Sequence, residues 1–311
     1  MSVLDQANRL AAAGRQAEAV ALVQRAAEND DPEALFALAN WRLFALFGPR
    51  NLADAHRFLD RAATLGHDDA IRTKAILVGN GTGCAADPLR AAEMLVTIRS
   101  RDSGAARQLD VASRMRPDKD LANDHVDRLS EAPDVRIHRA LLTREECAYL
   151  SATAEPLLRP SFVTNPDTGA RMADPIRTSL GMSIGPTDED LVVHRINVRI
   201  AQASGTDIAC GEPLQILRYA VGQEYRAHTD SRIGATNQRA WTVLIYLNDD
   251  YEGGATRFPR AALDVRGATG DALIFCNIDA GGDPDPASLH AGLPVTSGVK
   301  WLATRWIRAR P

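Results

Sequence analysis

Residues 214–230, LQILRYAVGQEYRAHTD, join an alternating apolar segment to a short pattern of potential metal ligands. The alternation from Leu214 to Tyr219 is typical of a β-strand, and Gly222 falls where a turn would follow it. In an extended chain, residues two positions apart point the same way, so His228 and Asp230 can face one pocket. This stretch therefore predicts a strand and turn that lead into a pair of ligands.

A third potential ligand, His290, and a lysine, Lys300, follow further along the chain. Two imidazoles and one carboxylate on one face of a metal leave three coordination positions open. Non-haem Fe(II) oxygenases use this arrangement, although such a ligand set also binds other divalent metals.

The tripeptide His-x-Asp is a weak signal, because the chain contains it three times. The other two copies begin at His67 and His125, in polar stretches with a helical character. Only the copy at His228 follows a strand-like segment and is followed by another histidine and an apolar strand with an embedded lysine. We therefore interpret the copies at His67 and His125 as surface residues.

The sequence from about residue 135 to the C-terminus resembles the prolyl 4-hydroxylase family of 2-oxoglutarate-dependent Fe(II) dioxygenases. Besides 214–230, the resemblance rests on QRAWTVLIYLND at 238–249, YEGGATRFP at 251–259, GDALIF at 270–275 and LHAGLPVTSGVKWLATRWI at 289–307. The family usually carries Glu after the Gly-Gly pair, where this chain has Ala255.

The resemblance implies a hydroxylase that oxidises an unactivated C–H bond, most often in a prolyl residue of a peptide or protein. Its cofactors would be Fe(II), 2-oxoglutarate, O2 and ascorbate, with succinate and CO2 as co-products. Two alternatives remain open from the sequence. The substrate could be a free amino acid or another small molecule, or the chain could be an interaction scaffold with a degenerate oxygenase domain.

By the same resemblance, His228, Asp230 and His290 would hold the metal. Lys300 would bind the far carboxylate of 2-oxoglutarate, because that charge needs a cation in a largely dry pocket. An outward-facing lysine is the alternative for Lys300.

Four further residues match positions near the family's site. The hydroxyl groups of Tyr219, Thr242 and Tyr246 would line the 2-oxoglutarate pocket, although a strand tyrosine such as Tyr246 is often only core. Arg239 would be the catalytic residue that helps to hold the substrate, or else an exposed cation at a strand end.

The second half of the chain predicts a double-stranded β-helix, or jelly roll, with flanking helices. Good strand candidates lie at 241–247, 272–276 and 299–307. Thr143 and Glu146 have the spacing of a capping box, which marks a helix start. By resemblance, the turn-rich segment 161–179 would form a loop that closes over the substrate.

The first third of the chain is repetitive, with an offset of 36 residues. This offset relates Ala19 to Ala55 and Ala91, and it relates Leu22 to Phe58 and Met94. Small residues in such a period allow close helix contacts, so the pattern predicts stacked helix pairs. The segment resembles Sel1-like or tetratricopeptide repeats, which often dock polypeptides.

These patterns together predict an α+β chain in three parts. A helical repeat domain would cover 1–110, a helical linker 111–133 and the dioxygenase domain 134–311. We expect a protein or peptide substrate, docked by the repeats.

Composition excludes several other classes. The 311 residues carry a formal net charge of −4, which argues against a general nucleic-acid binder. No apolar run is long enough to span a bilayer, and the N-terminus lacks the features of a signal peptide. The four cysteines form no Cys-x-x-Cys pair. We expect a cytoplasmic protein with no membrane partner.

Overall fold

The chain forms two compact units in the computed structural model, which describes residues 1–116, 125–164, 171–173, 176–232 and 234–311. The first unit comprises Met1–Ser113 and Pro186–His194, and the second comprises Arg114–Gly185 and Arg195–Pro311. No described helix is both long enough and apolar enough to cross a bilayer.

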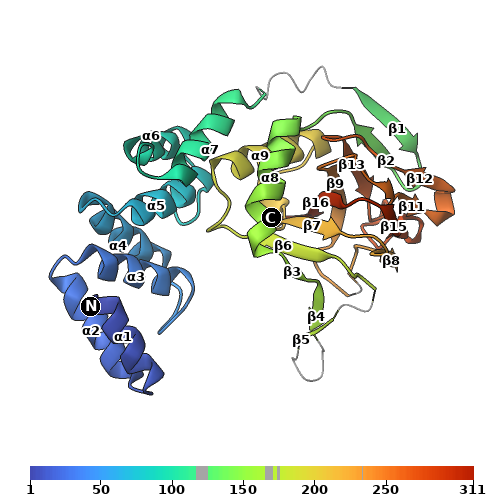
Figure 1. Ribbon diagram of the computed structural model, residues 1–311. Helices are drawn as coiled ribbons and strands as arrows, with labels where there is room; N and C mark the ends of the chain where they lie inside the picture. The colour runs from blue at the N-terminus through green and yellow to red at the C-terminus, as the bar shows by residue number, and fades with distance from the viewer. Residues whose placement is uncertain (117–124, 165–170, 174–175, 233) are drawn as a thin grey trace. The chain divides into compact units, whose positions relative to one another are not determined.

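The first unit is built from antiparallel helices (Figure 1). They are α1 Val3–Ala12, α2 Gln16–Glu28, α3 Pro32–Leu43, α4 Leu52–Thr64, α5 Asp68–Asn80, α6 Pro88–Ile98 and α7 Ser103–Arg114. Their caps repeat with the predicted period of 36. The N-cap side chains of Asp31 and His67 begin α3 and α5, and those of Asn51 and Asp87 begin α4 and α6. The predicted helix pairs are thus confirmed.

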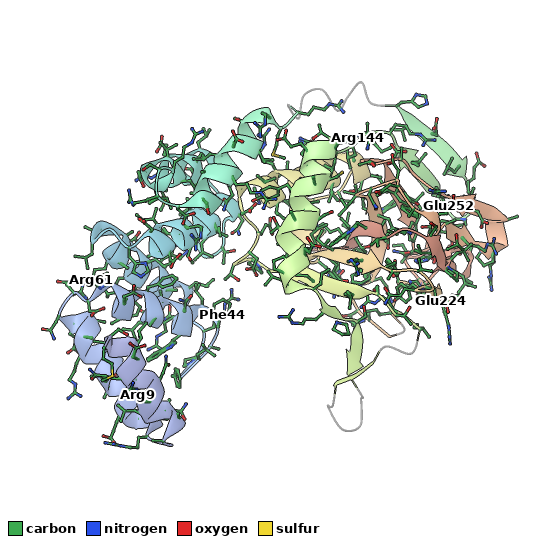
Figure 2. The ribbon with its side chains drawn as sticks, viewed as in Figure 1. Arg9, Phe44, Arg61, Arg144, Glu224 and Glu252 are labelled. Atoms are coloured by element: carbon green, nitrogen blue, oxygen red, sulfur yellow. The ribbon has the colours of Figure 1, made fainter. Side chains whose placement is uncertain are left out.

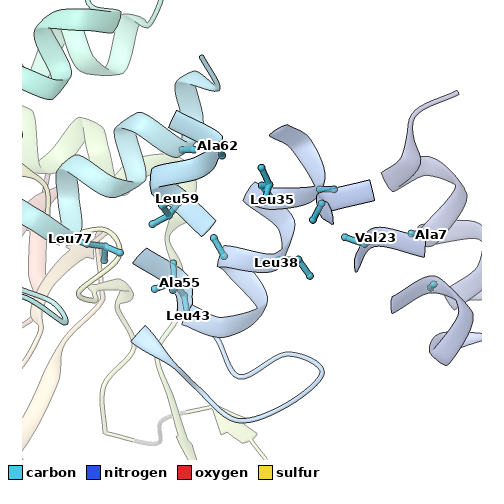
Figure 3. Close-up of a cluster of buried hydrophobic side chains, with 14 residues drawn as sticks. Ala7, Val23, Leu35, Leu38, Leu43, Ala55, Leu59, Ala62 and Leu77 are labelled. Carbon is cyan, nitrogen blue, oxygen red and sulfur yellow. The ribbon is translucent and has the colours of Figure 1, made fainter. Parts of the chain in front are cut away.

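Small residues line the contacts between these helices, as the repeat pattern predicted. Ala19, Ala55 and Ala91 are all buried. Larger side chains such as Leu35 and Leu59 fill the space between successive helices (Figure 3). Charged side chains such as Arg61 point outward (Figure 2).

The second unit contains two main antiparallel sheets (Figure 1). The larger has the order β1-β2-β13-β9-β16-β7-β6-β3, and the smaller has the order β12-β11-β14-β8. The larger comprises β1 Val126–Ser130, β2 Val135–His138, β3 Arg159–Pro160, β6 Leu180–Ile184, β7 Leu214–Tyr219, β9 Arg239–Tyr246, β13 Ala272–Cys276 and β16 Lys300–Arg308. The smaller comprises β8 Tyr225–His228, β11 Thr256–Phe258, β12 Leu263–Val265 and β14 His290–Gly292.

Shorter elements complete the unit. Two-stranded pairs join β10 Glu252–Gly253 to β15 Val295–Ser297 and β4 Phe162–Thr164 to β5 Arg171–Ala173. Helix α8, Arg144–Ala154, starts with the predicted capping box of Thr143 and Glu146. Helix α9, Leu191–Ser204, belongs to this unit from Arg195 onward.

The core of this unit lies between its sheets. Phe258 and Val265 of the smaller sheet pack with Tyr246, Phe275 and Leu302 of the larger one. The predicted jelly roll with flanking helices is confirmed, as are the strands expected at 241–247, 272–276 and 299–307.

The helical linker expected at 111–133 is wrong in its second half. Val126–Ser130 is a strand, β1, which pairs with β2 at the edge of the larger sheet. Its polar, half-exposed residues carry no strand pattern of their own, so only its pairing with the following strand β2 reveals it. Residues 117–124 of this linker lie outside the described residues, as do 165–170 and 174–175 of the expected substrate loop.

Candidate metal centre

Two neighbouring strands of the smaller sheet bring the predicted ligands together. His228 ends β8 and His290 begins β14, and the two residues are direct partners in the antiparallel register. Asp230 follows β8 by two residues. One ligand atom from each of the three side chains lies within 4.8 Å of the others, and this is the one metal-ligand cluster found among the described residues.

Both imidazoles are held in one orientation by a main-chain carbonyl. Nδ1 of His228 lies 2.8 Å from the Arg226 carbonyl oxygen, and Nδ1 of His290 lies 2.9 Å from that of Ser288. A carbonyl can only accept, so Nδ1–H donates and the lone pair is left on Nε2. The two Nε2 atoms lie 3.6 and 3.7 Å from the Asp230 carboxylate. A hydrogen bond from Nδ1–H to a main-chain carbonyl is typical of metal-binding histidines.

A hydrogen-bond chain orients Asp230. The Thr242 hydroxyl donates to Asp230 Oδ2 at 2.6 Å, and the Asn277 amide donates to that hydroxyl at 2.8 Å. Burial alone would raise the pKa of Asp230. The adjacent imidazoles of His290 and His228 and the Thr242 hydroxyl outweigh burial and hold this pKa well below its usual range.

The protonation states of the cluster suit a metal. Burial lowers the pKa of His290 to about 4, although the Asp230 carboxylate opposes this shift. A neutral imidazole beside an ionised carboxylate is the state in which both groups can donate electron pairs to a cation. The residues present therefore fit the Fe(II) site that the sequence predicted.

A pocket extends from this cluster along the face of β16. Its wall includes Lys300, Leu302, Thr304 and Trp306, which alternate along the strand and so share one face. The side chain of Lys300 is almost fully buried, and its ammonium group donates to the Gly254 carbonyl at 2.7 Å. Lys300 therefore faces the pocket, and the alternative of an outward-facing lysine is wrong.

Of the three predicted hydroxyl groups, only that of Tyr219 belongs to a described wall residue of this pocket. Tyr219 is the register partner of Lys300. Thr242 instead supports Asp230, and the Tyr246 hydroxyl lies 3.3 Å from the Val265 carbonyl in the core.

Arg239 is not among the described wall residues of the pocket, where a substrate-holding side chain would be expected. Its guanidinium donates two hydrogen bonds to Glu212, at 2.8 and 2.7 Å. It also lies 3.7 Å from the ring centroid of Trp306, which does border the pocket. Arg239 therefore contacts the pocket through Trp306. The alternative prediction, an exposed cation at a strand end, is also wrong, because Arg239 pairs with Glu212.

Tyr225 and Arg177 are among the wall residues that sequence reasoning missed. The Tyr225 ring stacks on the His228 imidazole, with the centroids 3.5 Å apart. The Arg177 guanidinium lies 5.3 Å from the Tyr225 ring. The position of Tyr225 in the ligand strand was an available signal, whereas Arg177 lies in a distant segment with no local pattern.

The two other His-x-Asp copies have no metal geometry. His67 caps α5 by accepting a hydrogen bond from the Ala70 backbone, and His125 is an exposed residue that pairs with Asp127. His125 is thus a surface residue as expected, whereas the His67 side chain is only 8% exposed and has a structural role.

Comparisons with known proteins agree with this geometry. A family model described as the 2OG-Fe(II) oxygenase superfamily matches residues 214–308. Prolyl 4-hydroxylase 1 of Arabidopsis thaliana is 35% identical over 228 residues, which span 66% of this chain and 81% of that protein.

Two solved structures are also similar. A viral collagen prolyl hydroxylase from Paramecium Bursaria Chlorella virus-1, in complex with 2OG, shares 27% identity over 56% of this chain and 96% of its own, with a TM-score of 0.46. A Sel1 repeat protein from Oxalobacter formigenes shares 21% identity over 35% of this chain and 85% of its own, with a TM-score of 0.33.

The family model covers every residue of the cluster, and the plant relative covers 66% of the chain. The chain belongs to the prolyl 4-hydroxylase family of 2OG-Fe(II) oxygenases and is a 2-oxoglutarate-dependent dioxygenase.

Proposed function

We propose that this protein hydroxylates a prolyl residue in a peptide or protein, and that succinate and CO2 are its co-products. One observation supports this proposal above the others. The cluster of His228, Asp230 and His290 opens into a pocket that also contains a buried cation, Lys300. A metal site and a carboxylate site in one pocket are what the co-substrate 2-oxoglutarate requires.

The residues of the cluster and the side chains that support them have defined tasks in this proposal. His228, Asp230 and His290 would hold Fe(II). Fe(II), when bound, supplies the O2 and C–H oxidation chemistry, in which one oxygen atom enters succinate and the other the new hydroxyl group. Thr242 and Asn277 keep the Asp230 carboxylate in its ligating orientation.

Lys300 would recognise the second carboxylate of 2-oxoglutarate. Its ammonium group now donates to one carbonyl oxygen, and two donor positions remain for a carboxylate. Apolar neighbours such as Leu217, Leu244 and Leu302 keep water away from this charge pair, which strengthens it. Tyr219 lies beside Lys300 in the same wall.

A prolyl substrate is proposed because the curated relatives are named prolyl 4-hydroxylases. A free amino acid is the alternative, and the two differ in their dependence on peptide length. We further propose that the repeat unit docks the substrate protein, since stacked helix pairs present extended binding surfaces.

The test measures succinate formed from 2-oxoglutarate by the purified protein with Fe(II) and ascorbate. Reactions would contain no further substrate, free proline, or proline-containing peptides. We expect a peptide to stimulate turnover, and mass spectrometry to show a gain of one oxygen atom on its proline.

Asp230→Ala should abolish this turnover. The matched control is His125→Ala, which removes a histidine from a His-x-Asp copy without metal geometry and should leave turnover unchanged. Stimulation by free proline alone would favour the small-molecule alternative. Peptide-stimulated turnover that persists in Asp230→Ala would contradict the metal assignment.

A further inference from the structure

The sheet face that forms the pocket continues beyond it to the edge strand β3. The hydrogen-bond register aligns Arg159 of β3 with Gly181 of β6, then with Leu217 of β7 and Leu302 of β16. Residues in one such row point to the same face of the sheet. Leu217 and Leu302 border the metal pocket, so the Arg159 side chain lies on the pocket face as well.

A second row runs in parallel. It joins Ser183 of β6 to Gln215 of β7, then to Thr304 of β16 and Leu244 of β9. Thr304 and Leu244 border the metal pocket, whereas Ser183 and Gln215 lie further toward the sheet edge. Both rows thus lead from the metal outward across β7 and β6.

A groove lies over the outer part of these rows. It measures about 460 Å³, and its wall includes Arg159, Ser161, Arg177, Gly181, Gln215 and Leu217. Arg177 and Leu217 also border the metal pocket, so the groove and the pocket share a wall. A ligand that fills the groove would therefore approach the metal cluster at one end.

Gly181 keeps the floor of this groove low. A Cβ atom at this position would come within 3.0 Å of the Leu217 side chain, which is closer than nearly all real Cβ contacts. No side chain therefore rises from the middle of the floor, between Arg159 and Leu217. This leaves room for a backbone to cross the strands.

The charged side chains in the described part of the groove wall are positive. The described wall residues include two arginines, Arg159 and Arg177, and no acidic side chain. Arg177 lies at the junction with the metal pocket, against the ring of Tyr225. Arg159 lies on the edge strand and is exposed to solvent. Guanidinium groups at both ends favour a ligand with carboxylates.

We infer that this groove binds the substrate segment next to the oxidised residue and that its two arginines select acidic side chains there. The inference rests on the proposed polypeptide substrate. From β16, in the wall of the metal pocket, to β3, at the outer end of the groove, there are three strand spacings, about 14 Å. An extended peptide covers that length with about four residues. The preferred acidic residues should therefore lie about two to four positions from the oxidised proline.

The test uses three peptides of about eleven residues, each with one central proline in a Gly-Ala background. Glu, Gln or Lys occupies the positions three and four residues away on both sides. We expect kcat/KM for the Glu peptide to exceed that for the Lys peptide at least about tenfold at low salt. High salt should reduce the difference, because it screens exposed charges.

Arg159→Glu should remove or reverse this preference mainly through KM. The matched control is Arg218→Glu, which makes the same charge change on β7. Arg218 neighbours Leu217 but its register partner in β6 is Leu180, so it lies on the opposite face of the sheet. This control should keep the wild-type preference.

Binding of fluorescein-labelled peptides, measured by anisotropy without O2, separates the inference from the proposed function. A Glu preference in binding that Arg159→Glu abolishes would support the groove even if no peptide were hydroxylated. Turnover of all three peptides at equal kcat/KM would overturn the groove assignment while the proposed hydroxylase stands. Equal affinity for the Glu and Lys peptides, or equal loss in both variants, would also overturn it.

Discussion

Lys300 combines a buried charge with a proposed role in binding 2-oxoglutarate. Burial is the main reason that its pKa falls to about 8, and the charge of Arg266 contributes to the shift. The free enzyme therefore loses this cation as the pH rises through about 8. We predict that the KM for 2-oxoglutarate is nearly constant below that pH and rises about tenfold per pH unit above it.

Two tyrosines whose rings lie near the Lys300 ammonium group do not titrate in this window. They are Tyr246 and Tyr251, whose pKa values burial raises, that of Tyr251 to about 12. Initial rates between about pH 6.5 and 9.5 would measure the effect. Lys300→Arg, which stays charged throughout, should flatten the profile, whereas Lys300→Met should lose 2-oxoglutarate affinity at every pH. A flat wild-type profile would argue against Lys300 as the carboxylate partner.

For individual residues, the sequence predicted the metal ligands but not every role around them. His228 and Asp230 could be predicted because residues two positions apart in an extended chain point the same way. Thr242, Leu244 and Tyr246 share one face of β9, so periodicity alone could not tell which of them reaches the pocket. Three-dimensional contacts decide this. Thr242 bonds to Asp230, and Tyr246 bonds to the Val265 carbonyl.

At the element scale, a buried ion pair fixes the start of α8. The Arg199 guanidinium of α9 lies 2.9 Å from both carboxylate oxygens of Glu146, the capping-box residue of α8, and both side chains are inaccessible to solvent. Arg199 also donates to the carbonyls of Leu141 and Arg116. Removing the arginine would leave a buried carboxylate without its cation.

We therefore predict that Arg199→Met lowers the free energy of unfolding by about 3–5 kcal/mol. Urea denaturation followed by circular dichroism would measure this. Arg128→Met, which removes an exposed arginine from long contacts with Glu131 and Asp134 at 3.9 and 3.8 Å, should change it by less than about 1 kcal/mol. Arg199→Met together with Glu146→Leu should recover part of the loss. Similar losses in Arg199→Met and Arg128→Met would contradict this account.

The elements differ in how far local sequence determines them. Leu214–Tyr219 and Ala272–Cys276 were predicted because alternating or continuous apolar residues mark strands in a buried sheet. Val126–Ser130 was not, because it is a polar edge strand that depends on its pairing with β2. Pairing of distant segments also places Arg159 in the same row as Leu217, which no local pattern could indicate.

At the scale of the whole molecule, the repeat unit presents an unusual turn. The α3–α4 connection has positive φ at Ala45 and Phe47, both 55°, and the α5–α6 connection has positive φ at Gly81 and Gly83, both 80°. These positions are 36 residues apart and thus equivalent. The first turn therefore adopts a conformation suited to glycine, at a cost of about 1–2 kcal/mol per residue, while it exposes aromatic side chains.

Substitution of these exposed aromatic side chains tests whether the repeats dock the substrate protein. Phe44 and Phe47 are 53% and 45% exposed, and apolar side chains gathered on one surface often mark a binding site. We predict that Phe44→Ser combined with Phe47→Gly leaves kcat/KM for short peptides unchanged and lowers that for a full-length protein substrate at least about fivefold. Glycine suits the backbone at position 47, which offsets the loss of the edge contact between the Phe47 and Trp41 rings.

Turnover of a peptide and of the protein that contains it would be compared in one assay. Leu89→Ser is the matched control, since Leu89 is 81% exposed on another repeat. Equal loss on peptide and protein in the Phe variant would indicate a structural effect of the turn. Unchanged kcat/KM for both the peptide and the protein would show that Phe44 and Phe47 contribute nothing to substrate binding. The docking surface would then lie elsewhere.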